Sequence, residues 1–118
     1  MNRFFKSFVY AFRGLNVYFR SAGNVRVHMA MTVLVIAGGF YYHLGRSDWE
    51  MLLICIGMVL IAEAFNTSIE WLMDHVSPEY HERAGQVKDI AAGAVLIAAI
   101  ITAIVGCMIF IPKITGCC

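Results

Sequence analysis

Three long apolar segments limit what this chain of 118 residues can fold into. They are residues 27–44 (VHMAMTVLVIAGGFYYHL), residues 49–73, which begin WEMLLICIGMVLIA, and residues 90–112 (IAAGAVLIAAIITAIVGCMIFIP). A helix needs about 20 mostly apolar residues to cross the hydrocarbon core of a bilayer, and each segment is long enough to cross it with some tilt. The sequence therefore predicts one all-α membrane domain, residues 1–118, with three transmembrane helices.

The composition supports this prediction. The chain is 60% hydrophobic and only 14% charged, whereas an average soluble domain is about half apolar and about a quarter charged. The additional apolar residues need surroundings other than water. A formal net charge of +1 gives no indication of a nucleic-acid partner.

The first 26 residues form a different kind of element. Their apolar residues recur mostly at spacings of three and four, with basic residues between them, which is typical of an amphipathic helix lying in the membrane interface. Arginines interrupt every apolar stretch before residue 27, so a cleaved signal peptide is not expected. The apolar set is Phe4, Phe5, Phe8, Phe12, Leu15 and Phe19.

Lysine and arginine also predict the orientation. Residues 1–26 contain five of them and no acidic residue, whereas the 44–48 turn has only Arg46 and the C-terminal tail only Lys113. Because positively charged segments stay in the cytoplasm, the N-terminus should be cytoplasmic. Three crossings then place the polar 74–89 link (DHVSPEYHERAGQVKD) inside and the C-terminus outside.

The second apolar segment ends in a polar stretch, EAFNTSIEWLMD, residues 63–74. On a helix with about 100° per residue, Glu63, Asn66, Glu70 and Asp74 fall within roughly 80° of one another and form a polar stripe. Acids inside a membrane almost always face a protein interior or a wet cavity. The 74–89 link is short enough to bring Lys88 to the lower end of the stripe.

These residues alone leave three functions open. Carboxylates and a lysine at the membrane rim suit a divalent metal and phosphoryl transfer. An acidic stripe also suits a proton-coupled transporter or hydrogen bonds that only hold helices together. No phosphate-binding loop or kinase glycine-rich loop occurs in the sequence.

The two blocks EAFNTSIEWLMD and PEYHERAGQVKDIAAGAVLIAA resemble the small prokaryotic integral-membrane lipid kinases, the diacylglycerol kinase and undecaprenol kinase family. The family pattern is roughly E-x-x-N-[ST]-[AS]-I-E-x-x-x-D followed by [SA]-G-x-x-K-D-x-[AG]-[SA]-[AG]-A-V. The resemblance implies phosphorylation of a lipid alcohol, diacylglycerol or undecaprenol, with ATP and Mg²⁺ at the cytoplasmic face of a bacterial inner membrane. It also implies a domain-swapped homotrimer with shared active sites. KDIAAGAVL and NVRVH are more similar to the undecaprenol branch.

The resemblance implies roles for the stripe, residue by residue. Glu63 would be the catalytic base that takes the proton of the lipid hydroxyl. Asn66 would hydrogen-bond in the same site, and Glu70 would bind the Mg²⁺ that bridges the ATP phosphates. Asp74 would support the site at the membrane boundary.

A second set of residues would contact the nucleotide in such a kinase. Lys88 would contact the phosphates, and Asp89 would lie beside the nucleotide. Arg3 occupies the position of an arginine that the family uses near the nucleotide.

One position departs from the family pattern S-E-x-N-x-R-x-H. The corresponding stretch is SAGNVRVH, residues 21–28, in which Asn24, Arg26 and His28 match but Ala22 replaces the acid. In the family that acid is a metal ligand, and residues 1–47 contain no other acid. A weakly active or inactive family member is therefore an alternative, and a small transporter is a more remote one.

Other residues have simpler interpretations. The dispersed histidines, His28 among them, are expected to be interfacial or hydrogen-bonded. Small residues at 38–39 and 91–93 suit close helix packing. Cys55 and Cys107 are predicted to be apolar filler, and the sequence assigns no role to Cys117 and Cys118.

Overall fold

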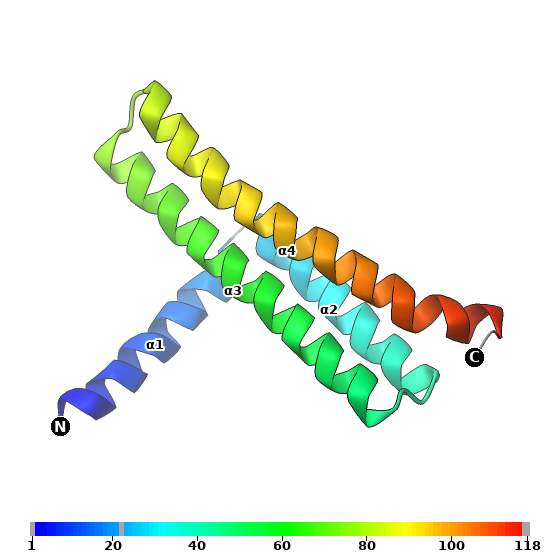
Figure 1. The fold of residues 1–118 in the computed structure, drawn as a ribbon. Helices are drawn as coiled ribbons and strands as arrows, with labels where there is room; N and C mark the ends of the chain where they lie inside the picture. Colours follow the sequence, from blue (N-terminus) through cyan, green and yellow to red (C-terminus); the bar gives the residue numbers. More distant parts are fainter. Residues whose placement is uncertain (1, 22, 117–118) are drawn as a thin grey trace.

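The computed structural model describes residues 2–21 and 23–116, and within these ranges all regular structure is helical. Four helices follow one another along the chain: α1 (Arg3–Arg20), α2 (Asn24–Tyr41), α3 (Arg46–Val76) and α4 (Glu82–Thr115). Figure 1 shows α3 and α4 side by side as an antiparallel hairpin, with α2 along one half of it. α1 turns away from α2 by 94°.

The helices differ in their ability to cross a membrane. α3 and α4 are each long and apolar enough, whereas α2 qualifies only together with α1, if the bent pair is counted as one crossing. α2 has 18 residues and is therefore about 27 Å long, slightly shorter than the ~30 Å hydrocarbon core. The described residues thus contain two to three candidate spans, where the sequence predicted three.

α1 is an amphipathic helix with little cover from the rest of the chain. It begins where the Asn2 side chain accepts a hydrogen bond from the backbone N–H of Phe4, 2.6 Å away. Among its residues only Tyr18 is buried, and its phenylalanines are 45–69% exposed. A row of exposed phenylalanines needs an apolar surface outside this chain, which a bilayer provides.

Small residues form the seam between α3 and α4. Ala84, Ala91 and Ala98 are buried and lie seven residues apart, so they share one face of α4. Side chains of this size let two helices approach closely. Of the small residues predicted to pack at 91–93, Ala91 is buried and Ala92 is exposed.

The turn between α2 and α3 is fixed by an aromatic contact. The Trp49 ring lies against Gly39, where an added Cβ would stand 2.6 Å from the indole, and 5.0 Å from the centroid of the Phe40 ring. His43 takes a positive φ of 53° in this turn. Glycine at 39 is therefore what allows the start of α3 to pack against the end of α2.

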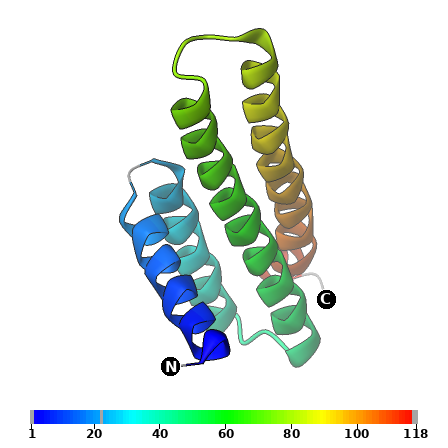
Figure 2. The same cartoon turned by 90° about the vertical axis from the view of Figure 1, so that its left-hand side faces the viewer.

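The link between α3 and α4 is shorter than the expected 74–89. Only residues 77–81 lie outside the helices, because α3 continues to Val76 and α4 starts at Glu82. The break lies at Pro78, which lacks a backbone N–H, and the His81 side chain accepts a hydrogen bond from the N–H of Arg83. Asp74 and Lys88 are therefore held on helices and not on a loop. Figure 2 shows this end of the hairpin extending beyond α2.

Candidate active site

The polar stripe on α3 runs from a buried end to an exposed end. Glu63 and Asn66 are 3% and 4% exposed, whereas the Asp74 side chain is 65% exposed. At 1.5 Å per residue, Glu63 lies about 21 Å along the helix from Trp49 and Asp74 about 38 Å. If Trp49 marks one edge of a hydrocarbon core about 30 Å thick, Glu63 lies within the core and Asp74 beyond its other edge.

Asn66 and Glu70 form a pair within the stripe. The Asn66 Nδ2 donates a hydrogen bond to Glu70 Oε1 at 2.9 Å, which fixes the orientation of both side chains one helical turn apart. The remaining amide oxygen of Asn66 is buried and, within the described residues, accepts no hydrogen bond. An amide oxygen and a carboxylate are hard oxygen donors, the ligand type that Mg²⁺ prefers.

The stripe alone does not enclose a metal ion. Within residues 2–21 and 23–116, His, Cys, Asp and Glu side chains do not gather in a group of three that could hold one. Mg²⁺ usually takes one or two protein carboxylates and completes its shell with phosphate oxygens and water. The residues therefore fit a magnesium ion that arrives with a nucleotide.

Lys88 reaches the exposed end of the stripe. Its Nζ lies 2.8 Å from Asp74 Oδ1 and donates a hydrogen bond to it. Lys88 precedes the apolar part of α4, and the hydrogen bond that it donates to Asp74 is the main cause of its raised pKa, with smaller contributions from the charges of Glu70 and Asp89. The structure thus brings Glu70, Asp74, Lys88 and Asp89 to one end of the hairpin, as the sequence predicted for Lys88.

Two predicted positions are not part of this cluster. Arg3 is the first residue of α1, and Figure 1 shows that end of α1 far from the α3–α4 link. Ala22, which replaces the expected acid, lies outside the described residues.

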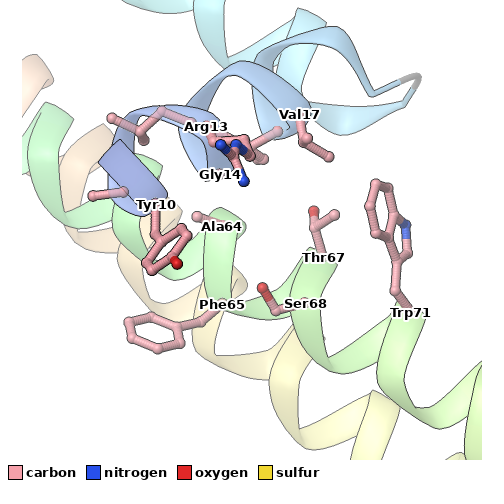
Figure 3. Close-up of a pocket in the computed structure, with 12 residues that line it drawn as sticks. Tyr10, Arg13, Gly14, Val17, Ala64, Phe65, Thr67, Ser68 and Trp71 are labelled. Carbon is pink, nitrogen blue, oxygen red and sulfur yellow. The ribbon is translucent and has the colours of Figure 1, made fainter. Parts of the chain in front are cut away.

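A cleft of about 870 Å³ separates α1 from α3 next to the stripe. Figure 3 shows Tyr10 and Arg13 of α1 on one side and Phe65, Thr67 and Trp71 of α3 on the other. The walls are mostly apolar, with a few hydroxyl groups among them. Ala64 and Thr67 directly follow Glu63 and Asn66 in the sequence, so the cleft adjoins the helix segment that carries Glu63.

The comparisons with known proteins decide the family. The sequence profile described as "Prokaryotic diacylglycerol kinase" matches residues 9–110. The chain is 40% identical to the undecaprenol kinase of Bacillus subtilis (strain 168) over 114 residues. This matched region covers 97% of this chain and 93% of the relative. The chain belongs to the prokaryotic diacylglycerol kinase family.

Two further relatives are diacylglycerol kinases. The enzyme of Synechocystis sp. (strain ATCC 27184 / PCC 6803 / Kazusa) is 38% identical over 109 residues, covering 92% of this chain and 62% of the relative. That of Escherichia coli (strain K12) is 28% identical over 107 residues, covering 91% and 88%. The chain is therefore a membrane lipid kinase, which resolves the choice between catalysis, transport and structural polarity that the residues alone left open.

Sequence reasoning missed one polar neighbour of Glu63 in this lipid kinase and undervalued another. The His28 Nε2 on α2 lies 3.5 Å from Glu63 Oε2, close enough for an ion pair when the imidazole is protonated but without hydrogen-bond geometry. Tyr18 on α1 is buried, and this burial, followed by the Glu63 carboxylate, raises the pKa of its phenol. No pattern in the sequence separates Tyr18 from the other aromatic residues of α1. His28 matched the family pattern at residues 21–28, but nothing in the sequence placed it next to Glu63.

Proposed function

We propose that this lipid kinase transfers the γ-phosphoryl group of ATP to the primary hydroxyl of a membrane lipid alcohol at the cytoplasmic face. The observation that carries the proposal is the burial of Glu63. Glu63 is 3% exposed at membrane depth, and an apolar cleft adjoins its segment of α3. A lipid chain can lie in such a cleft while its hydroxyl meets the carboxylate.

Glu63 is the proposed general base. The lipid hydroxyl oxygen forms a bond to the γ-phosphorus, the bond from that phosphorus to the β–γ bridging oxygen breaks, and the hydroxyl proton passes to the Glu63 carboxylate. Glu63 lies at the buried end of the stripe, beside the apolar cleft, where the hydroxyl of a membrane lipid can reach it.

The other stripe residues bind the nucleotide in this proposal. Mg²⁺ held by Glu70, with Asn66 beside it, would neutralise charge on the ATP phosphates. Lys88 contacts the phosphates after leaving Asp74, which supports the site at the membrane boundary, and Asp89 lies beside the nucleotide. The lipid hydroxyl then lies at the buried end of the stripe, beside Glu63, and the ATP phosphates lie at its exposed end, beside Lys88.

The proposed assembly is a domain-swapped homotrimer with shared sites, an interfacial α1 and three membrane-crossing helices. Its N-terminus lies in the cytoplasm of a bacterial cell, as the basic N-terminal residues indicate. The position of Arg3 supports the sharing of sites. It lies far from Lys88 of its own chain, so an Arg3 that acts near a nucleotide has to act in the site of a neighbouring subunit.

Undecaprenol is the proposed acceptor, with diacylglycerol as the alternative. The 40% identical relative is called an undecaprenol kinase, and the stretches KDIAAGAVL and NVRVH favour the same branch. Both lipids present a primary hydroxyl at the head-group level, so the two acceptors must be compared directly.

The test uses purified protein in mixed micelles with ATP, Mg²⁺ and either lipid. ADP release should depend on the lipid and should fall by about 10² to 10³ in Glu63→Gln and in Glu70→Gln, the range typical of losing a catalytic group. Asp48→Asn, on the same helix at the opposite end, is the matched control and should keep the parent rate. Full activity of Glu63→Gln would overturn the assignment of the base.

A weakly active enzyme is a second candidate, favoured by Ala22. If the missing acid limits the metal site, Ala22→Glu should increase kcat and lower the Mg²⁺ concentration needed for half-maximal rate. An unchanged magnesium dependence would show that position 22 does not contribute to the metal site in this chain.

A further inference from the structure

Two helices, α1 and α2, each bring a polar side chain to the buried carboxylate of Glu63. Glu63 belongs to α3, His28 to α2 and Tyr18 to α1, and the exposed fractions of Tyr18 and Glu63 are 7% and 3%. The His28 Nε2 lies 3.5 Å from Glu63 Oε2. Tyr18 lines the same cleft as Ala64, the residue that follows Glu63 on α3. The base of the proposed reaction is therefore enclosed by residues from outside its own helix.

The hydrogen bonds at this point are incomplete. Within the described residues, the Tyr18 hydroxyl and Glu63 Oε2 are both buried and neither has a hydrogen-bond partner. Buried polar groups in native proteins are normally paired, so a buried donor beside a buried acceptor calls for an explanation. A phenylalanine at position 18 would fill the same space without a hydroxyl to satisfy.

We propose that Tyr18 is a positioning residue for the lipid kinase reaction, donating its hydroxyl to Glu63, with His28 supporting the same carboxylate from α2. This inference rests on the proposed role of Glu63 as the base. A donor on one carboxylate oxygen fixes the rotamer of Glu63 and leaves the other oxygen to take the proton of the lipid hydroxyl. The contact requires α1 to pack against α3, so the interfacial helix contributes directly to the geometry of the base.

A structural role and a positioning role of Tyr18 predict different results for Tyr18→Phe. If the hydroxyl only stabilises the fold, the variant should lose thermal stability and its activity should fall with the fraction folded. If the hydroxyl positions Glu63, kcat should fall in protein that remains folded, beyond any loss of the folded fraction, because the Glu63 carboxylate loses the donor that fixes its rotamer.

The experiment compares Tyr18→Phe with Tyr41→Phe, an exposed tyrosine at the far end of α2. In mixed micelles with undecaprenol or diacylglycerol, Tyr18→Phe should lower kcat about ten- to hundredfold, the loss expected for a hydrogen bond to a charged acceptor. The KM for ATP should stay within about twofold, since the nucleotide contacts are elsewhere. Tyr41→Phe should match the parent in kcat, KM and unfolding temperature.

Two further variants separate the possible failures. His28→Gln should also lower kcat without raising the KM for ATP. In a Glu63→Gln background, measured with radiolabelled ATP, Tyr18→Phe should cause no additional loss, because the two residues act as one unit. An equal kcat for Tyr18→Phe and Tyr41→Phe, or a fall in kcat matched by a fall in stability, would overturn the positioning role while Glu63 stays the base. Parent-like activity of Glu63→Gln would instead overturn the proposed function.

Discussion

The ε-amino group of Lys88 lies 2.8 Å from Oδ1 of Asp74, so an ion pair joins α3 and α4 at the exposed end of the polar stripe. The link of residues 77–81 brings the two together across 14 positions in sequence. Their side chains are 39% and 65% exposed, so water screens the pair and it contributes little to stability. The ion pair with Asp74 is therefore weak enough for a triphosphate to replace the carboxylate as the partner of Lys88.

Lys88→Met should impair nucleotide binding while leaving the fold intact. Removing a charged donor to phosphate is expected to raise the KM for ATP by about tenfold or more. The unfolding temperature should hardly change, because the lost ion pair is exposed. Lys113→Met, at the other end of α4, is the matched control. Equal KM values for the two variants would show that Lys88 does not contact the phosphates.

Asn66→Leu should raise the Mg²⁺ concentration needed for half-maximal rate more than it raises the KM for the lipid. It removes the hydrogen bond that orients Glu70, and outer contacts of this kind typically contribute 10- to 100-fold to metal affinity. The measurement is the Mg²⁺ concentration that gives half-maximal ADP release. Ser47→Ala, an exposed position at the opposite end of α3, is the control. An unchanged magnesium requirement in Asn66→Leu would separate Asn66 from the metal site.

Much of the fold followed from apolar spacing and hydropathy. The second and third apolar segments became α3 and α4, and the stripe of Glu63, Asn66, Glu70 and Asp74 lies on one helix, because residue spacing fixes the face of a helix without knowledge of the rest of the fold. The end of the stripe near Lys88 was also predictable, since a short link limits how far two helix ends can separate. The link itself was placed too wide, because polar residues such as those at 82–89 continue a helix as readily as they form a loop.

The neighbours of Glu63 could not be predicted in this way. Tyr18 and His28 reach it through the packing of α1 and α2 on α3, and that packing depends on the direction in which each helix leaves its turn. The direction is set by turn geometry, such as the φ of 114° at Gly23, and one sequence does not encode it as a periodic pattern. α2 has only 18 residues, which is short for a membrane-spanning helix. This too could be recognised only once the structure gave the ends of the helix.

Gly39→Ala should destabilise the protein, although alanine favours helices over glycine. The added Cβ would lie 2.6 Å from the Trp49 ring, and forcing extra volume into a packed contact typically costs about 1–3 kcal/mol. Thermal unfolding in detergent should show a lower midpoint. Gly57→Ala, where nothing lies within 4 Å of the added Cβ, should be neutral or stabilising. Replacing Trp49 with Leu should restore stability to Gly39→Ala if the ring is the cause.

Tyr18 should make the stability of the folded protein sensitive to alkaline pH. Burial and then the Glu63 carboxylate raise the pKa of Tyr18 above its ordinary value of 10.0. The neutral phenol is thus favoured in the folded state, so its contribution is fully present below pH 10 and is lost as the pH rises through the folded-state pKa. Lys88, whose pKa is also raised, loses its contribution at alkaline pH as well. The comparison must therefore be made between variants that all retain Lys88.

The measurement is the free energy of unfolding of the parent and of Tyr18→Phe at pH 8 and at about pH 11. The parent should lose more stability than Tyr18→Phe between these two values, because only the parent has to keep a phenol neutral beside a carboxylate. Tyr80→Phe, at a tyrosine that is 89% exposed, should lose as much as the parent. If all three proteins lose the same amount, the Tyr18 hydroxyl does not lie in the buried, negatively charged surroundings of Glu63, and its role in positioning that carboxylate would have to be abandoned as well.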